Sequence, residues 1–585
     1  MKQELEQLLL AAIAKLTGTG LPETPAAGTV VLERTREAQH GDFATNLALR
    51  LAKSARRSPR ELAQAIVAAL PPSPLLERAE VAGAGFINFH LAPAAYAREI
   101  AGIHAQGATY GESRLGRGER VMVEFVSANP TGPLHVGHGR HAAYGATLAN
   151  ILAAVGFAVG REFYVNDAGR QMDIMAASVW MRYLEAFGEP LPFPENGYRG
   201  DYVRDIAARL RTAVGEQLLR PAKAVLADLP ADAPAGDKEA YVDALIARAR
   251  ELIGAEAFAR VLQISRDEVL GDIRSDLEEF GVTFDRWFSE RSLEESGGID
   301  RALARLESHQ RLYRKDGALW FRATDFGDEK DRVVVRENGQ KTYFASDIAY
   351  HLDKRERGFQ RLIDVWGADH HGYIARVRAG LAAMGEPPGC FEVPLIQIVN
   401  LFRGGTQVPM GKREGQFVTL RQLRGEVGND ACRFFYLMRS NDQPLDFDLE
   451  LAKSRSNENP VYYIQYAHAR VASVMKQLGA RGLAFEREAG LADAALLTSP
   501  HEQAVLKSLT RYPEILEQAA VNRAPHSLAH YLRELANEFH TYYNAEAFIV
   551  EAAPLRNARL ALILAVQQVL RNGLTLLGVS APESM

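Results

Sequence analysis

The chain has 585 residues, several times the usual size of a single domain, so three or four packed units around separate cores are expected. Its composition, with 47% hydrophobic and 24% charged residues and 26 prolines, is that of an ordinary globular protein and leaves little room for long disordered segments. The net charge of −5 excludes attraction to nucleic acid through overall charge, so a nucleic-acid partner would have to be bound by local basic surface.

Two features of the sequence bear on compartment and metal content. The only cysteines are Cys390 and Cys432, which excludes a disulfide framework and a four-cysteine zinc site, so both are expected to be small core residues. The apolar residues of the first 16 positions form one helical stripe, but Glu4 and Glu6 break a signal-peptide pattern. No uninterrupted apolar run reaches the roughly 18 residues needed to span a bilayer. We therefore expect a cytoplasmic protein without structural zinc.

The N-terminal part predicts a small α+β domain, residues 1–115, followed by a βαβ unit. Helical patterns lead to a glycine-punctuated stretch at 81–90, whose last residues alternate as in a strand. An apolar strand at 121–126 then precedes a Pro/Gly turn and an Ala-rich helix that reaches about Val155, and a second strand follows at 163–165.

The remainder predicts a multidomain α/β protein. Residues 172–280 carry long Ala, Leu and Arg periodicity, which indicates a mainly helical insertion. Strand-like segments then return at 332–336, 342–344, 361–366 and 391–400. This order predicts a Rossmann-like parallel sheet in a catalytic domain, residues 116–453, interrupted by the insertion. Helical periodicity dominates residues 454–585 and predicts an all-α bundle.

Two histidines stand where the first predicted strand turns into the Ala-rich helix. His135 and His138 occur in Pro-Leu-His-Val-Gly-His, at a helix start whose unpaired N–H groups and positive dipole end favour a phosphate. Imidazole donors can add stabilisation as charge builds on that phosphate, and Gly137 would let an adenine ring lie close to the backbone. The alternative is a helix start with two solvent-exposed histidines. The segment resembles the HIGH signature of class I aminoacyl-tRNA synthetases, which makes His135 and His138 candidate catalytic residues.

A second segment resembles the KMSKS loop of the same class. Residues 408–415, Val-Pro-Met-Gly-Lys-Arg-Glu-Gly, retain Met410 and Lys412, whereas Pro409 replaces the first lysine and both serines are lost. A lysine suits this loop because it is a flexible point charge that can neutralise a triphosphate. Some arginyl enzymes carry a lysine just before the histidine motif instead, and residues 116–134 contain none. The resemblance thus implies a catalytic role for Lys412 and an ATP contact for Met410, although a plain surface loop is the alternative.

The third segment is Trp-Gly-Ala-Asp-His-His at 366–371, which follows a predicted strand. Open α/β sheets bind ligands at the carboxyl ends of their strands, so Gly367, Asp369 and His370 are candidate ATP-binding residues, with Asp369 on the ribose hydroxyls. An Asp and two histidines also invite a metal interpretation, but residues so close in sequence rarely converge on one ion. The resemblance requires only ATP, with Mg²⁺ carried in on its phosphates.

Four further residues match the arginyl-tRNA synthetases of the bacterial type. A guanidinium is planar with five donors, so a selective pocket should offer carboxylates able to form bidentate pairs. The resemblance implies that Asp347 pairs the guanidinium, that Tyr343 shapes the slot, and that Glu124 and Asn129 hold the amino-acid end. Each could instead be a helix cap or a strand-edge residue, and Asp347, at the start of an apparent helix, is a natural N-cap.

Segments similar to the same family extend over the whole chain, including 164–171, 458–470 and 573–578. The resemblance implies that the first domain contacts the tRNA and that the last binds the anticodon. Tyr542 and Tyr543 are candidate stacking residues for anticodon bases, although tyrosines at this spacing are more often core residues.

The reaction implied by this resemblance is the ATP-dependent attachment of L-arginine to tRNA(Arg) through an arginyl-adenylate, with release of AMP and pyrophosphate, by a monomer that activates arginine only when tRNA is bound. Two alternatives remain at this point. One is another class I synthetase or a smaller nucleotidyltransferase with the same histidine motif. The other is a non-catalytic tRNA-binding paralogue, which the altered loop at 409–413 would suit.

Overall fold

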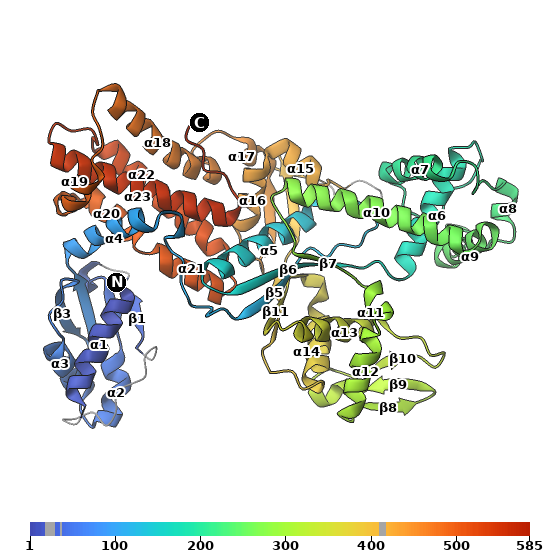
Figure 1. Cartoon of the computed structure of the whole chain (residues 1–585), viewed down its shortest axis with the longest axis horizontal. Coiled ribbons are helices and arrows are strands. Elements are labelled where there is room, and N and C mark those ends of the chain that lie inside the picture. Colours follow the sequence, from blue (N-terminus) through green and yellow to red (C-terminus); the bar gives the residue numbers. More distant parts are fainter. Residues whose placement is uncertain (18–29, 36–37, 409–416) are drawn as a thin grey trace.

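The computed structural model describes residues 1–585 except 18–29, 36–37 and 409–416. An α+β domain forms the N-terminal end, drawn in blue in Figure 1, and its antiparallel sheet has the order β1-β2-β4-β3. Its elements are α1 (Lys2–Leu16), β1 (Leu32–Arg34), β2 (Phe43–Thr45), α2 (Leu47–Ala55), α3 (Pro59–Ala69), β3 (Leu76–Ala82), β4 (Phe86–Leu91) and α4 (Pro93–Gln106). The predicted stripe of α1 is real, since Leu5, Leu9 and Ile13 are fully buried.

A five-stranded parallel sheet in the order β13-β11-β5-β6-β7 lies at the centre of the molecule. Its strands are β5 (Arg120–Glu124), β6 (Ala158–Val165), β7 (Arg286–Ser289), β11 (Arg361–Asp364) and β13 (Phe391–Glu392). The helix α5 (Val136–Ala154) connects β5 to β6, which confirms the predicted βαβ unit. Because helices cover both faces, the central strand β5 is apolar throughout its middle, and Val121 and Val123 are fully buried.

The predicted helical insertion lies between β6 and β7 and extends away from the sheet (Figure 1). It consists of α6 (Arg170–Glu185), α7 (Asp201–Val214), α8 (Ala222–Leu226), α9 (Lys238–Ile253) and α10 (Ala255–Glu279). A second insertion, which the sequence analysis did not separate, follows β7 and contains a small antiparallel sheet. It consists of α11 (Arg291–Glu295), α12 (Gly298–Ser308), β8 (Leu312–Lys315), β9 (Ala318–Phe321) and β10 (Arg332–Val335).

Two predicted strands are wrong in type or extent. The segment 342–344 is the start of α13 (Tyr343–Glu356), because the Thr342 side chain accepts a hydrogen bond from the Ala345 N–H and caps a helix that local β propensity concealed. The segment 391–400 forms three short strands, since Pro394 cannot donate to a sheet ladder. After β13 these are β14 (Leu395–Ile396), which pairs with β12 (Trp366–Gly367), and β15 (Val399–Arg403), which pairs with β16 (Thr406–Gln407) and β17 (Leu445–Asp448).

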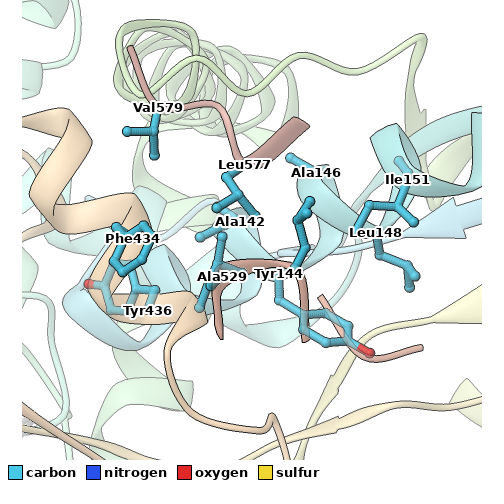
Figure 2. Close-up of a cluster of buried hydrophobic side chains, with 14 of the residues drawn as sticks. Ala142, Tyr144, Ala146, Leu148, Ile151, Phe434, Tyr436, Ala529, Leu577 and Val579 are labelled. Atoms are coloured by element: carbon cyan, nitrogen blue, oxygen red, sulfur yellow. The ribbon is translucent and has the colours of Figure 1, made fainter. Parts of the chain in front are cut away.

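The C-terminal part is an all-α bundle, as predicted, and it packs directly on the catalytic domain. Connecting helices are α14 (Ile374–Ala383), α15 (Leu420–Val427), α16 (Asn429–Leu437) and α17 (Leu449–Lys453); the bundle contains α18 (Pro460–Ala480), α19 (Arg487–Ala492), α20 (Pro500–Leu509), α21 (Tyr512–Val521), α22 (His526–Ala545) and α23 (Ala553–Leu577). Figure 2 shows side chains of α5 together with Phe434 and Tyr436 of α16, Ala529 of α22 and Leu577 of α23 in one apolar cluster. The helix that opens the histidine motif is therefore part of the core that joins the two domains.

One helix of the described chain, α23, is long and apolar enough by length and composition to cross a membrane. In this structure 67% of its apolar window is buried inside the bundle, which is the pattern of a core helix. Both cysteines, Cys390 and Cys432, are free and buried, as expected of small core residues.

Candidate active site

A cavity of about 1310 Å³ opens at the carboxyl ends of β5 and β11. This is the edge at which a parallel sheet binds ligands. Every predicted catalytic, ATP-binding and arginine-binding residue that the structure describes lines this one cavity: Glu124, Asn129, His135, Gly137, His138, Tyr343, Asp347, Gly367, Asp369 and His370. The tertiary structure thus brings together three sequence segments, the first of which precedes the other two by more than 200 residues.

The two histidines of the motif form the first turn of α5. His135 is the N-cap, and its Nδ1 accepts a hydrogen bond from the Gly137 N–H at 3.1 Å, while Nδ1 of His138 accepts from the His135 N–H at 3.2 Å. The rings stack with their centroids 3.7 Å apart. Because each Nδ1 acts as an acceptor, the proton of each neutral ring sits on Nε2. A side chain at Gly137 would lie 2.9 Å from Cε1 of His135, so glycine also keeps this stacked pair possible.

The turn between β5 and α5 is strained. Val126 and Ser127 both have positive φ, 69° and 41°, which residues other than glycine rarely adopt. Ser127 is held there by two hydrogen bonds, since its Oγ donates to Glu124 at 2.8 Å and accepts from the Tyr164 N–H at 3.1 Å. Both strained residues line the cavity, so the strain coincides with the site.

Glu124 and Asn129 reach the cavity with partners from other elements. The amide of Asn129 donates to Gln171 at the start of α6. Glu124 is buried and accepts a hydrogen bond from Lys354 Nζ at 2.5 Å. Burial raises the pKa of the Glu124 carboxyl, and the Lys354 charge opposes this shift. Sequence reasoning missed Lys354, which lies 230 positions away and has no motif of its own.

The helix α13 supplies Tyr343 and Asp347 from its first two turns. Because Thr342 is the N-cap, Asp347 is not a capping residue, and its carboxylate instead accepts a hydrogen bond from the Tyr373 hydroxyl. Burial raises the pKa of Asp347. Tyr343 is 60% exposed at the wall of the same cavity.

Glu290 is an acidic residue of the cavity that the sequence analysis missed. Burial raises its pKa to about 7, and the neighbouring charges of Asp347 and Asp167 add to the shift. Glu290 directly follows β7, at the carboxyl end of a parallel strand. A residue at the carboxyl end of a parallel strand is a candidate site residue, but Arg286–Ser289 was not recognised as a strand in the sequence.

Gly367 belongs to β12, and Asp369 and His370 follow in a short 3₁₀ segment, Ala368–Tyr373. The side chains of Asp369 and His370 are 81% and 64% exposed and stand 3.6 Å apart, at the open edge of the cavity. His141, one turn beyond His138 on α5, lines the cavity too, and burial lowers its pKa to about 4. Within the described ranges, no group of three or more His, Cys, Asp or Glu residues could hold a metal ion.

Comparison with known proteins decides the family. The chain is 59% identical to the arginine–tRNA ligase of Thioalkalivibrio sulfidiphilus (strain HL-EbGR7), over 100% of both chains, and 53% identical to the arginine–tRNA ligase of Legionella pneumophila (strain Paris), also over 100% of both. The chain belongs to the arginyl-tRNA synthetase family.

Family models and a solved structure agree with this assignment. The arginyl tRNA synthetase N terminal domain matches residues 3–91, the catalytic domain of class I (R) tRNA synthetases matches 99–190, and the DALR anticodon binding domain matches 464–585. The arginyl-tRNA synthetase of Thermus thermophilus superposes with a TM-score of 0.72 at 25% identity, with 100% of both chains covered.

Met410 and Lys412 lie outside the described residues, although Val408 and Phe417 on either side line the cavity.

The prediction that Tyr542 stacks on anticodon bases is wrong for this structure, because its ring is fully buried against Phe548. The hydroxyl of Tyr542 donates to buried Glu502 at 3.4 Å, which is the role of a core tyrosine.

Tyr543 differs from its neighbour. It is half-buried, and the Arg470 guanidinium lies 4.5 Å from its ring centroid. The same guanidinium lies 4.4 Å from the ring of Tyr466. Tyr543 therefore stays a candidate for stacking on a base.

Proposed function

We propose that this chain attaches L-arginine to tRNA(Arg) in two steps within the cavity described above. In the first step the arginine carboxylate attacks the α-phosphate of ATP, which forms arginyl-adenylate and releases pyrophosphate. In the second step a terminal ribose hydroxyl of the tRNA takes the arginyl group and AMP leaves. The observation that supports this reaction is a single cavity that joins a histidine-bearing helix start to two carboxylates, Asp347 and Glu290, which form no ion pair with a lysine or arginine among the described residues.

The α5 end of the cavity is suited to the triphosphate. The first N–H groups of α5 and its positive dipole end favour an anion, and the Nε2–H groups of His135 and His138 can donate to phosphate oxygens as charge develops. We assign Lys412 the neutralisation of the leaving pyrophosphate, Met410 and Gly137 contacts with the adenine, and Asp369 the ribose hydroxyls. Mg²⁺ would enter on the phosphate oxygens, the ligand type that this ion prefers.

The α13 end of the cavity is suited to the arginine. Asp347 and Glu290 offer two carboxylates to a planar cation with five donors, and the exposed ring of Tyr343 can cover its face. One carboxylate oxygen of Glu124 accepts a hydrogen bond from Ser127 and the other accepts one from Lys354. Each oxygen therefore keeps a second lone pair for the α-ammonium group of arginine. A neutral analogue would leave the carboxylates of the guanidinium site unpaired, so discrimination should need no editing step.

Purified protein tests the function directly. Aminoacylation of total tRNA should be seen with arginine and with no other standard amino acid, and it should require ATP. Charging of a different amino acid would identify another class I synthetase. Tight tRNA binding with aminoacylation below background would identify a non-catalytic paralogue.

The remaining assignments concern partners and location. We place tRNA contacts on residues 1–115 and the anticodon on residues 454–585, and we expect a cytoplasmic monomer. Light scattering of the purified chain at micromolar concentration should give the mass of one chain, 64.4 kDa. A mass of twice that value would refute the monomer.

A further inference from the structure

A buried cluster of charges forms part of the floor of the cavity, and one member, Lys354, lies beneath it. Its centre is Lys354 on α13, which is fully buried and lies between two carboxylates. The Nζ atom donates to Glu124 of β5 at 2.5 Å and to the two oxygens of Asp364 of β11 at 2.9 and 3.0 Å. It also stands 4.3 Å from the ring centroid of Tyr350. One side chain therefore ties a helix to two adjacent strands of the parallel sheet.

A second side chain of the same helix reinforces this tie. His351 Nε2 lies 2.8 Å from Asp364, and its Nδ1 lies 2.7 Å from the main-chain oxygen of Asp347. Asp364 holds its negative charge firmly, because Lys354 and His351 outweigh the effect of burial and lower its pKa to about 2. Burial opposes the charge of Lys354, but the neighbouring carboxylates Asp364 and Glu124 raise its pKa, so Lys354 and Asp364 form an ion pair.

The geometry of α13 connects this array to the guanidinium end of the cavity. Asp347, His351 and Lys354 are spaced at i, i+4 and i+7, so they lie along one face of the helix. Asp347 and Glu124, the carboxylates assigned to the two cationic ends of arginine, belong to different elements. Their separation is consequently set by how far along its axis α13 sits relative to β5, and Lys354 joins these two elements through a buried, charged hydrogen bond to Glu124.

We propose that Lys354 is a positioning residue that fixes the distance between the guanidinium-binding and ammonium-binding carboxylates, so that the enzyme selects arginine by the length of its side chain. This inference rests on the proposed function. Stability alone gives little reason for such a cluster, because well-packed apolar residues often replace buried ion pairs without loss. A fixed separation between Glu124 and Asp347 does require a directional contact, and Lys354 supplies it with three short hydrogen bonds.

The test compares arginine with two homologues, one a methylene shorter and one a methylene longer, in aminoacylation with tRNA. The Lys354→Met variant should raise the KM for arginine at least 30-fold and leave the KM for ATP within twofold. Its ratio of kcat/KM for arginine over each homologue should fall at least tenfold. The matched control is Arg355→Met on the same helix, since Arg355 bonds Glu386 outside the cavity and should keep the wild-type ratios.

A second variant covers a failure of Lys354→Met to fold, which circular dichroism would reveal. Lys354→Arg keeps the charge but places a larger, forked head between the carboxylates. It should change the ratio of kcat/KM between arginine and each homologue at least threefold, while arginine is still attached to the tRNA. A folded Lys354 variant with unchanged ratios, or with parallel rises in the KM of ATP and arginine, overturns the inference. If wild-type protein does not charge arginine, the proposed function itself fails.

Discussion

Glu290 is buried and Asp347 is half-buried in one shared cavity, and in the described part of the chain no ion pair joins either of them to a lysine or arginine. A buried charge without an ionic partner is costly, and in both residues burial raises the pKa, which favours the neutral form of the carboxyl. A guanidinium that enters the cavity would relieve this cost for both residues. We therefore expect these two carboxylates to favour a planar cation over a neutral ligand.

The Asp347→Asn variant tests whether this carboxylate, which the sequence resemblance already indicated, pairs the guanidinium of arginine. The amide has the same shape but no charge, so the KM for arginine should rise about 100-fold, equivalent to roughly 3 kcal/mol. The KM for ATP should change less than threefold, because the nucleotide is assigned to the α5 end of the cavity. Steady-state aminoacylation with saturating tRNA measures both constants. Equal changes in the two would remove Asp347 from the arginine pocket.

Glu290 should make arginine binding depend on pH near neutrality. Its pKa is raised to about 7 by burial and then by Asp347 and Asp167, so the carboxylate that pairs a guanidinium forms as the pH rises. Between pH 6 and 8 the ionised fraction goes from about 10% to about 90%, and the Kd for arginine should fall up to tenfold. Titration calorimetry at constant ionic strength measures the Kd. The Glu290→Gln variant should bind more weakly with a flatter profile, and an unchanged slope would refute the assignment.

The helix α13 is the element on which the proposed amino-acid site depends. Its first turns carry Tyr343 and Asp347, and its later turns carry His351 and Lys354, which bind the strands beneath. Its N-terminus is fixed by Thr342, whose hydroxyl accepts from the Ala345 N–H and donates to the Val333 carbonyl of β10 at 2.9 Å. The small sheet of the second insertion therefore anchors the end of the helix that carries the proposed guanidinium site.

Thr342→Ala should loosen this end of α13. Loss of the cap costs about 1 kcal/mol, so the amide of Ala345 should exchange hydrogen about fivefold faster. Tyr343 and Asp347 lie in the affected turns, so the KM for arginine should rise several-fold. Hydrogen exchange read by mass spectrometry gives the first quantity, with Thr342→Ser, which retains the hydroxyl, as the control. Equal exchange in the alanine and serine variants would show that the cap does not hold the helix.

At the scale of the whole molecule, the catalytic domain and the helical bundle share a core. Arg433 of α16 is buried and donates to the carbonyls of Leu577 at the end of α23 and Phe280 at the end of α10, at 2.8 and 3.0 Å. Asn150 of α5 donates to the Leu576 carbonyl at 3.0 Å. The helix that bears the histidine motif is thus bonded to the domain that matches the anticodon-binding model.

A mutation on the bundle surface should change tRNA binding without changing arginine binding in the active site. Tyr543→Ala should weaken tRNA binding between fivefold and 100-fold, because stacking on one base contributes about 1–3 kcal/mol. The KM for arginine at saturating tRNA should stay the same. Filter binding at one fixed salt concentration measures the Kd. The control is Tyr542→Phe, which keeps the buried ring and should bind tRNA as the wild type does; a Tyr543→Ala variant with wild-type affinity would exclude base stacking at this position.

Motifs with a local physical reason could be predicted from the sequence. The helix start at His135 and His138, the apolar strand before it, the helical insertion and the C-terminal bundle follow from periodicity and from residue types over short windows. Asp347, Glu124 and Asn129 were indicated by resemblance alone, and the sequence could not decide between a ligand and a cap for Asp347. The structure settles the capping question, because Thr342 occupies the N-cap.

Three features had no local signal. Glu290 follows a four-residue strand that was not recognised, Lys354 is paired with a residue 230 positions away, and Tyr542 differs from Tyr543 only in the side of the helix that meets the core. Burial and charge pairing across separate elements are properties of packing, and a strand or helix pattern does not encode them.

By itself the sequence therefore determined the family, the order of the domains and the helix start that carries the histidine motif, because these depend on short segments with their own geometry. Only the tertiary structure decided which carboxylates share one cavity and how their surroundings shift their pKa values. The reason is physical: pKa values and distances between charges depend on neighbours that the chain brings together only when it folds.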